Sequence, residues 1–72
     1  DAVYAERLIW YVVKRGGCPY AEAYRFVHAH FPKMQDFEAV ITGAVRSGYL
    51  ILKQHGNEMM LLPGETSLGP EA

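Results

Sequence analysis

The chain has 72 residues, of which 50% are hydrophobic and 21% are charged, and its formal net charge is −1. This apolar content excludes a disordered chain, and a single cysteine, Cys18, excludes an internal disulfide framework and a four-cysteine zinc site. The longest apolar run, Leu8–Val13, is far shorter than the about 20 residues of a membrane-spanning helix, and the start shows no signal-peptide pattern. We therefore expect a small, soluble domain located inside the cell, in the cytoplasm, with no membrane partner.

Size and charge also bear on function. A chain of this length buries only roughly 60% of its unfolded surface, which leaves little room for a catalytic cleft beside its core. Residues 14–57 carry six cations against three anions, or +3, whereas residues 58–72 carry −3 and residues 1–13 carry −1. The mildly basic body permits contact with an anionic partner but does not require one. We expect a binding module and not an enzyme.

Residues 2–15 are predicted to form the first helix. At 100° per residue, one side is apolar and the charged side chains lie opposite. Lys14 and Arg15 fall in the last turn, where cations suit the helix dipole, and Gly16-Gly17 ends the helix. The apolar side consists of Ala5, Leu8, Ile9 and Val12.

Pro19 is predicted to lie in the first turn of a second helix, where its missing N–H leaves no intrahelical partner unsatisfied. Pro32 ends this segment, because the residue before a proline avoids the α region. The apolar residues at helical spacing between them are Tyr20, Ala23, Tyr24, Val27 and Phe31.

A third helix is predicted over residues 34–47, with Asp36 and Glu38 favouring its N-terminus and Gly48 as the residue that follows its end. Its apolar face consists of Phe37, Val40, Ile41, Ala44 and Val45. The opposite, outward face consists of Gln35, Glu38, Ala39, Thr42, Gly43 and Arg46.

A β-hairpin is predicted next. Residues 49–53 are β-prone, residues 55–57 have turn chemistry, and residues 59–62 are apolar again. A two-residue loop at Gly56-Asn57 would pair Leu52 with Leu61 and Lys53 with Met60. One face of this hairpin must pack on the helices, because an isolated hairpin is marginal in water. Residues 65–72 are polar and rich in glycine and proline, and we expect a flexible linker or tail there.

The order of three helices and a two-stranded hairpin resembles a winged helix-turn-helix domain, spanning residues 2–63 within a domain of residues 1–64. The pattern Val40-Ile41-x-x-Ala44-Val45 followed by Arg46-Ser47-Gly48-Tyr49-Leu50 carries the resemblance. It implies a small α+β fold, a three-helix bundle followed by the hairpin. It also implies a double-stranded DNA-binding domain of a transcription or replication regulator.

In that family the third helix lies in the major groove and the wing, here residues 53–58, contacts the backbone. Gln35 suits adenine, Arg46 suits guanine or phosphate, and Thr42 suits either base edges or phosphate. The remaining contacts that the resemblance implies are to the DNA backbone, from Arg25, Lys33, Lys53 and His55.

The third helix departs from a strongly DNA-reading helix, because Arg46 is its single cation and Asp36 and Glu38 lie on it. One copy is expected to bind weakly, so a homodimer or further DNA-binding surface would be needed for useful affinity. The alternative function is a winged-helix module for docking or dimerisation with no direct DNA contact.

Trp10 falls on the polar side of the first helix, with Val3 two turns away, and Phe26 lies off the apolar stripe of the second helix. Exposed large apolar groups often mark interfaces, so Val3, Trp10 and Phe26 are the candidate partner interface. The alternative for Trp10 is peripheral packing, against the C-terminal segment for example.

Other chemistry-bearing residues predict no catalytic or metal site. His28 and His30 are two apart on a helix and point about 200° apart, so both cannot bind one ion. Cys18 precedes a helix N-terminus, which lowers a thiol pKa, but burial beside Pro19 is the alternative. We find no Gly-rich phosphate loop and no nucleophile elbow, and we expect no cofactor.

Overall fold

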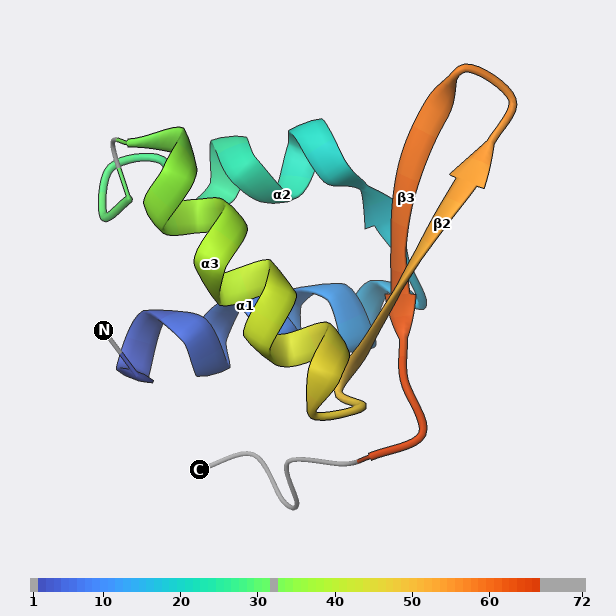
Figure 1. The fold of residues 1–72 in the computed structure, drawn as a ribbon, viewed down its shortest axis with the longest axis horizontal. Coiled ribbons are helices and arrows are strands. Elements are labelled where there is room, and N and C mark those ends of the chain that lie inside the picture. The colour runs from blue at the N-terminus through green and yellow to red at the C-terminus, as the bar shows by residue number, and fades with distance from the viewer. Residues whose placement is uncertain (1, 32, 67–72) are drawn as a thin grey trace.

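The structure is a computed structural model that describes residues 2–31 and 33–66, with side chains from residue 4 onward. The described residues form a small α+β domain of three helices and a three-stranded antiparallel sheet. Figure 1 shows the helices on one side of the sheet and the hairpin projecting beyond them. The elements in chain order are α1 (Ala2–Arg15), β1 (Cys18–Pro19), α2 (Tyr20–Val27), α3 (Met34–Arg46), β2 (Leu50–His55) and β3 (Glu58–Pro63).

α1 has the predicted bounds, and its glycine stop is confirmed. The N–H of Gly16 donates to the carbonyl of Val13 at 3.1 Å, and that of Gly17 donates to the carbonyl of Val12 at 3.0 Å. Both glycines have a positive φ, which the last turn requires for these bonds to close. The chain thereby leaves α1 sharply and passes to the sheet.

The sheet has a third strand that we did not predict. β1 pairs with β3, with Cys18 opposite Leu61 and Pro19 opposite Met60, so the strand order is β1-β3-β2. Pro19 is therefore not in the first turn of α2. It precedes that helix with φ −61° and ψ 143°, an extended conformation. The proline ring restrains φ alone, and pairing with β3 accounts for the extended ψ.

α2 is shorter than the apolar spacing up to Phe31 predicts. It ends at Val27, and residues 28–30 form a turn. The carbonyl of Val27 accepts from the N–H of both His30, at 2.8 Å, and Phe31, at 3.0 Å. Phe31 is nonetheless buried, so the apolar spacing reports burial here and not continued helix. A tight turn also keeps Phe31 itself out of the helix ahead of Pro32.

α3 begins where predicted and ends one residue earlier, with Ser47 as its C-cap. Gly48 follows with φ 83°, a left-handed conformation that glycine adopts without strain, and its prediction as the residue after the helix is confirmed. The N–H of Tyr49 then donates to the carbonyl of Ala44 at 2.9 Å. This connection turns the chain directly from α3 into β2.

The hairpin has the predicted register. Leu52 lies opposite Leu61 and Lys53 opposite Met60, on either side of the turn at residues 56–57. Opposite residues share a face, so Leu52, Leu61 and Cys18 form a row across the sheet, in which Leu52 on the edge strand β2 is 42% exposed. Leu61 and Cys18 are buried in that row.

The core lies between the helices and this sheet face. Phe37 is 0% exposed, and the rings of Tyr20 and Tyr24 meet it edge-on at 5.1 Å each. Among the side chains that the structure describes, no polar or charged one is buried. The buried residues are Leu8, Ile9, Val12, Cys18, Ala23, Val27, Phe31, Phe37, Ile41, Ala44, Leu50 and Leu61.

The predicted tail is described only in part, because residues 67–72 lie outside the described residues. The N–H of Gly64 donates to the carbonyl of Tyr49 at 2.8 Å, and the N–H of Thr66 donates to the carbonyl of Gly48 at 2.9 Å. The chain up to Thr66 is therefore bonded to the connection between α3 and β2.

Candidate nucleic-acid interface

The outward face of α3 is exposed over its whole length. Phe37, Ile41 and Ala44 are buried on the inner side, which turns Gln35, Thr42 and Arg46 to the surface. These three predicted contact residues therefore share one helix face. Lys53 and His55 are also exposed, on β2, as predicted for the wing.

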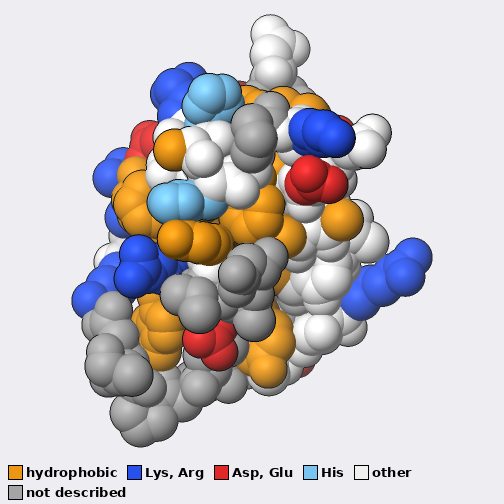
Figure 2. All heavy atoms as spheres, turned by 90° about the vertical axis from the view of Figure 1, so that its left-hand side faces the viewer, with side chains coloured by type: hydrophobic (Ala, Val, Ile, Leu, Met, Phe, Trp, Pro, Cys, Tyr) orange, Lys and Arg blue, Asp and Glu red, His pale blue; other side chains and the backbone are white. Residues whose placement is uncertain are grey.

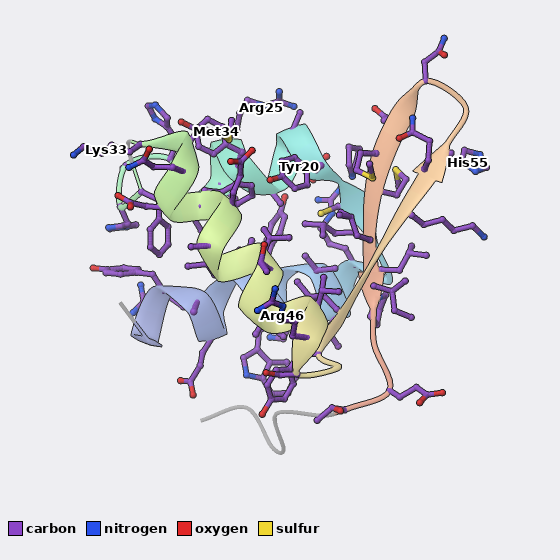
Figure 3. All side chains as sticks on the ribbon, in the orientation of Figure 1. Tyr20, Arg25, Lys33, Met34, Arg46 and His55 are labelled. Atoms are coloured by element: carbon purple, nitrogen blue, oxygen red, sulfur yellow. The ribbon has the colours of Figure 1, made fainter. Side chains whose placement is uncertain are left out.

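The predicted backbone contacts are separated from one another. Figure 3 places Lys33 and His55 at opposite ends of the long axis, with Arg25 at the top and Arg46 in front of the body. That axis extends over 33 Å. A duplex could be touched at several separate points, but these cations do not form one compact basic patch.

The charge on α3 and the hairpin sums to zero. The cations there, including the residue before α3, are Lys33, Arg46 and Lys53, and the anions are Asp36, Glu38 and Glu58, so three minus three is 0. All six side chains are exposed. Exposed charges of opposite sign largely cancel in their attraction for a distant polyanion.

The other cations gather on α1 and α2. These helices carry Arg7, Lys14, Arg15 and Arg25, against Glu6 and Glu22. Glu6 lines a groove on the opposite side of α1, whereas Glu22 lies where α1 meets α2 and is paired with Arg15. The two helices together carry four minus two, or +2. The prediction from the sequence did not find this surface, because it weighed the two helices separately.

Aromatic rings are stacked between α1 and α2 on the same side. Phe26 lies flat on Tyr11, with ring centroids 4.0 Å apart, and His30 lies flat on Tyr4 at 3.7 Å. The Arg15 guanidinium carbon is 5.3 Å from the Tyr11 centroid, and that of Arg7 is 5.5 Å from the Tyr4 centroid. Each stack thus has an arginine over its tyrosine.

Histidines mark one end of this surface. Figure 2 shows the end of the molecule where α1 begins and α2 turns toward α3, with His side chains among hydrophobic ones and Lys and Arg side chains toward both edges of the view. His30 contributes its stacked ring, and the ring of His28 meets that of Tyr24 edge-on. Both histidines are therefore engaged with neighbouring tyrosines.

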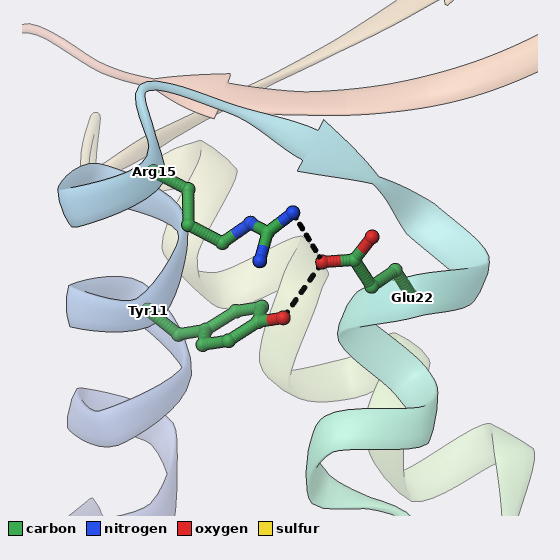
Figure 4. A network of polar contacts seen from close by, with 3 residues as sticks. All are labelled: Tyr11, Arg15 and Glu22. Atoms are coloured by element: carbon green, nitrogen blue, oxygen red, sulfur yellow. Dashed lines mark hydrogen bonds and ion pairs between the residues drawn. The ribbon is translucent and has the colours of Figure 1, made fainter.

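Glu22 joins the two helices by polar contacts. The hydroxyl of Tyr11 donates to Glu22 Oε2 at 2.7 Å, and Arg15 Nη2 lies 2.9 Å from the same oxygen (Figure 4). The hydrogen bond to Glu22 raises the pKa of Tyr11, since the bond favours the protonated hydroxyl, and partial burial adds to the rise. The neutral tyrosine is thereby kept in place beneath Phe26.

The candidate partner residues have different neighbours. Phe26 is 48% exposed and is stacked on Tyr11. Trp10 is half-buried and lines a pocket of about 100 Å³ with residues 63–66, which matches the peripheral packing considered for it. The Val3 side chain lies outside the described residues.

The groove on the other side of α1 lies between α1 and α3 and measures about 350 Å³. Ala39 and Gly43 line it from α3, and Ala5, Glu6 and Ile9 line it from α1. Because Ala39 and Gly43 are small, they leave this shallow hollow beside α3.

Cys18 is buried at 1% exposed, which matches the burial considered for it. Burial, with the nearby Glu22 carboxylate as a smaller contribution, raises the pKa of its thiol. Over the part of the chain that the structure describes, no three His, Cys, Asp or Glu side chains are placed to hold a metal ion. Within that part, no helix is both long and apolar enough to cross a bilayer.

Comparison with known proteins adds no relative. We found no match to this chain among protein-family models, curated proteins or solved structures.

Proposed function

We propose that the chain is a double-stranded DNA-binding domain of the winged-helix type, belonging to a transcription or replication regulator. The observation that supports this most is the fully exposed outer face of α3 next to a projecting hairpin. Burial of Phe37, Ile41 and Ala44 holds that face in one orientation. A helix presented in this way fits the major groove, while the hairpin reaches the backbone.

In this proposal Arg46 and Gln35 make the base contacts. Arginine pairs with the O6 and N7 acceptors of guanine, and glutamine pairs with N6 and N7 of adenine. Ala39 and Gly43 add no bulk between them, so the helix approaches the base edges closely. Thr42 contacts a base edge or a phosphate.

Phosphate contacts come from the surrounding cations. Arg25, Lys33 and Lys53 are exposed, and with Arg46 and His55 they offer three to five contacts. At ~0.9 per phosphate, the log–log dependence of the affinity on salt has a slope of about −3 to −5. Because Asp36, Glu38 and Glu58 oppose these contacts, one copy binds weakly, and a homodimer would raise the affinity.

The test is a fluorescence anisotropy titration of a labelled random-sequence duplex at about 50 and 200 mM salt. We expect Arg46→Ala to weaken binding about 5-fold or more, since a good base contact contributes ~1–3 kcal/mol. Arg7→Ala is the matched control, because Arg7 is an exposed arginine on α1, over the ring of Tyr4, and is not one of the proposed DNA contacts. Equal effects of the two substitutions, or a larger effect of Arg7→Ala, would refute α3 as the DNA-reading element.

The second candidate function is a winged-helix module that docks a protein. The zero net charge of α3 and the hairpin favours it, as does the 43% exposure of Met34 at the start of α3. Charge-depleted surfaces with exposed apolar side chains are typical of the centre of protein interfaces. Passage through a heparin column at low salt, without retention, would favour this function over DNA binding.

A further inference from the structure

We infer that the surface where α1 and α2 meet binds an acidic amphipathic helix of a partner protein. This surface, the α1–α2 face, consists of Tyr4, Arg7, Tyr11, Arg15, Phe26 and His30. The inference is independent of DNA binding by α3, because none of these residues belongs to α3 or the hairpin.

The apolar part of the recognition is a pair of aromatic stacks. Phe26 has one ring face against Tyr11, and it is still 48% exposed. His30 is likewise stacked on Tyr4 and exposed. Flat, immobilised rings lose little conformational entropy on binding, which is why aromatic residues dominate the energetics of protein interfaces.

The charged part is a set of arginines held next to those stacks. The guanidinium groups of Arg7 and Arg15 lie over the rings of Tyr4 and Tyr11. Arg15 is also paired with Glu22 at 2.9 Å, and its remaining N–H donors can bind a second carboxylate. Arginine is well suited to carboxylates, because its planar donors match both carboxylate oxygens. α1 and α2 together carry +2, whereas α3 and the hairpin, counted with Lys33, sum to zero. An acidic partner is therefore drawn to these two helices more than to α3.

The spacing of the stacks favours a helix as the occupant. Tyr4 and Tyr11 are seven residues apart on α1, which at 1.5 Å per residue places them about 10.5 Å apart along the axis. Two apolar side chains seven residues apart on a partner helix have the same separation, and such residues lie on one face. A partner helix packed along α1 thus places one apolar side chain at each stack and its carboxylates at the arginines.

The test uses a labelled synthetic peptide of about 20 residues, long enough to form a helix. It carries leucine at positions i, i+3, i+4 and i+7 and mostly glutamate elsewhere. One control peptide has alanine in place of leucine, and another has lysine in place of glutamate. A single-stranded oligonucleotide and a duplex are titrated in parallel, to identify a nucleic acid as the preferred ligand.

We expect the acidic leucine peptide to bind and both control peptides to bind at least about 5-fold more weakly. Phe26→Ala and Arg7→Gln should each weaken binding about 5-fold or more. Their matched controls on α3 are Met34→Ala, an exposed apolar side chain, and Arg46→Gln, an exposed arginine. Those controls should change the affinity less than about 2-fold, as is usual for residues outside an interface.

A second measurement does not depend on any variant folding. Amide chemical shifts of the unaltered protein, titrated with the same peptide, should change along α1 and α2 and not along α3. Absence of binding, shifts that concentrate on α3, or equal losses for the α3 controls would each overturn the inference. So would tighter binding of the oligonucleotide than of the peptide at these same residues.

Discussion

Gly17 connects α1 to β1, and its replacement by alanine tests how closely the chain must approach β3 at this point. Gly17 has φ 123°, a backbone conformation that residues with a Cβ rarely adopt. A Cβ on Gly17 would lie 2.7 Å from Cδ2 of Leu62 and 3.2 Å from the carbonyl oxygen of Leu61. The substitution therefore introduces backbone strain and a steric clash together.

The magnitude follows from these two effects. Strain in such a backbone region costs ~1–3 kcal/mol, and an overpacked contact costs ~1–3 kcal/mol. Reduced freedom of the unfolded chain offsets ~0.4–1 kcal/mol. We expect Gly17→Ala to lower the free energy of unfolding by about 1–5 kcal/mol, with the lower part of this range applying if the Leu62 side chain moves aside. At ~4–8 °C per kcal/mol for a domain of this size, even ~1 kcal/mol shifts Tm by about 4–8 °C.

Gly16→Ala is the matched control. Gly16 also has a positive φ, 72°, but a Cβ there meets nothing within 4 Å. Its cost is the ~1–2 kcal/mol of a left-handed residue alone. Urea unfolding, followed by the fluorescence of Trp10, the single tryptophan, measures both variants. Equal destabilisation by the two substitutions would refute the close approach of Gly17 to Leu62.

Four further predictions concern the core and the raised pKa values of Cys18 and Tyr11. Phe37→Ala should destabilise the domain by ~3–5 kcal/mol, because Phe37 is fully buried, and a loss below about 1 kcal/mol on urea unfolding would contradict its central position. The Cys18 thiol should react with iodoacetamide at pH 8 far more slowly in the folded protein than in urea, since it is buried with a raised pKa; similar rates would contradict this. Folding raises the pKa of the Cys18 thiol, so the neutral thiol contributes fully to stability at pH values below its ordinary pKa. This contribution is lost as the pH rises through the pKa of the folded protein. Cys18→Ala should therefore flatten the decline in stability at alkaline pH. Glu22→Gln should lower the pKa of Tyr11 toward its ordinary value in an absorbance titration, and an unchanged pKa would contradict the hydrogen bond between them.

The elements that local chemistry governs were predictable from the sequence. Apolar spacing and glycine positions predict the first helix and the start of the third helix. They also predict Gly48 as the residue that follows the third helix. The pairing of Leu52 with Leu61 follows from a two-residue turn, because loop length sets hairpin register. The exposure of Gln35, Thr42 and Arg46 follows from the burial of the opposite side of their helix.

Tertiary contacts decided the third strand, the end of α2 and the α1–α2 face. Cys18 and Pro19 form a strand because β3, which comes much later in the chain, lies beside them. The residues around Cys18 contain no local pattern that predicts this pairing. The end of α2 at Val27 depends in the same way on a turn that still buries Phe31. The α1–α2 face needs both helices docked, since charge and aromatic content are properties of single residues, whereas a binding surface is a property of their positions in space.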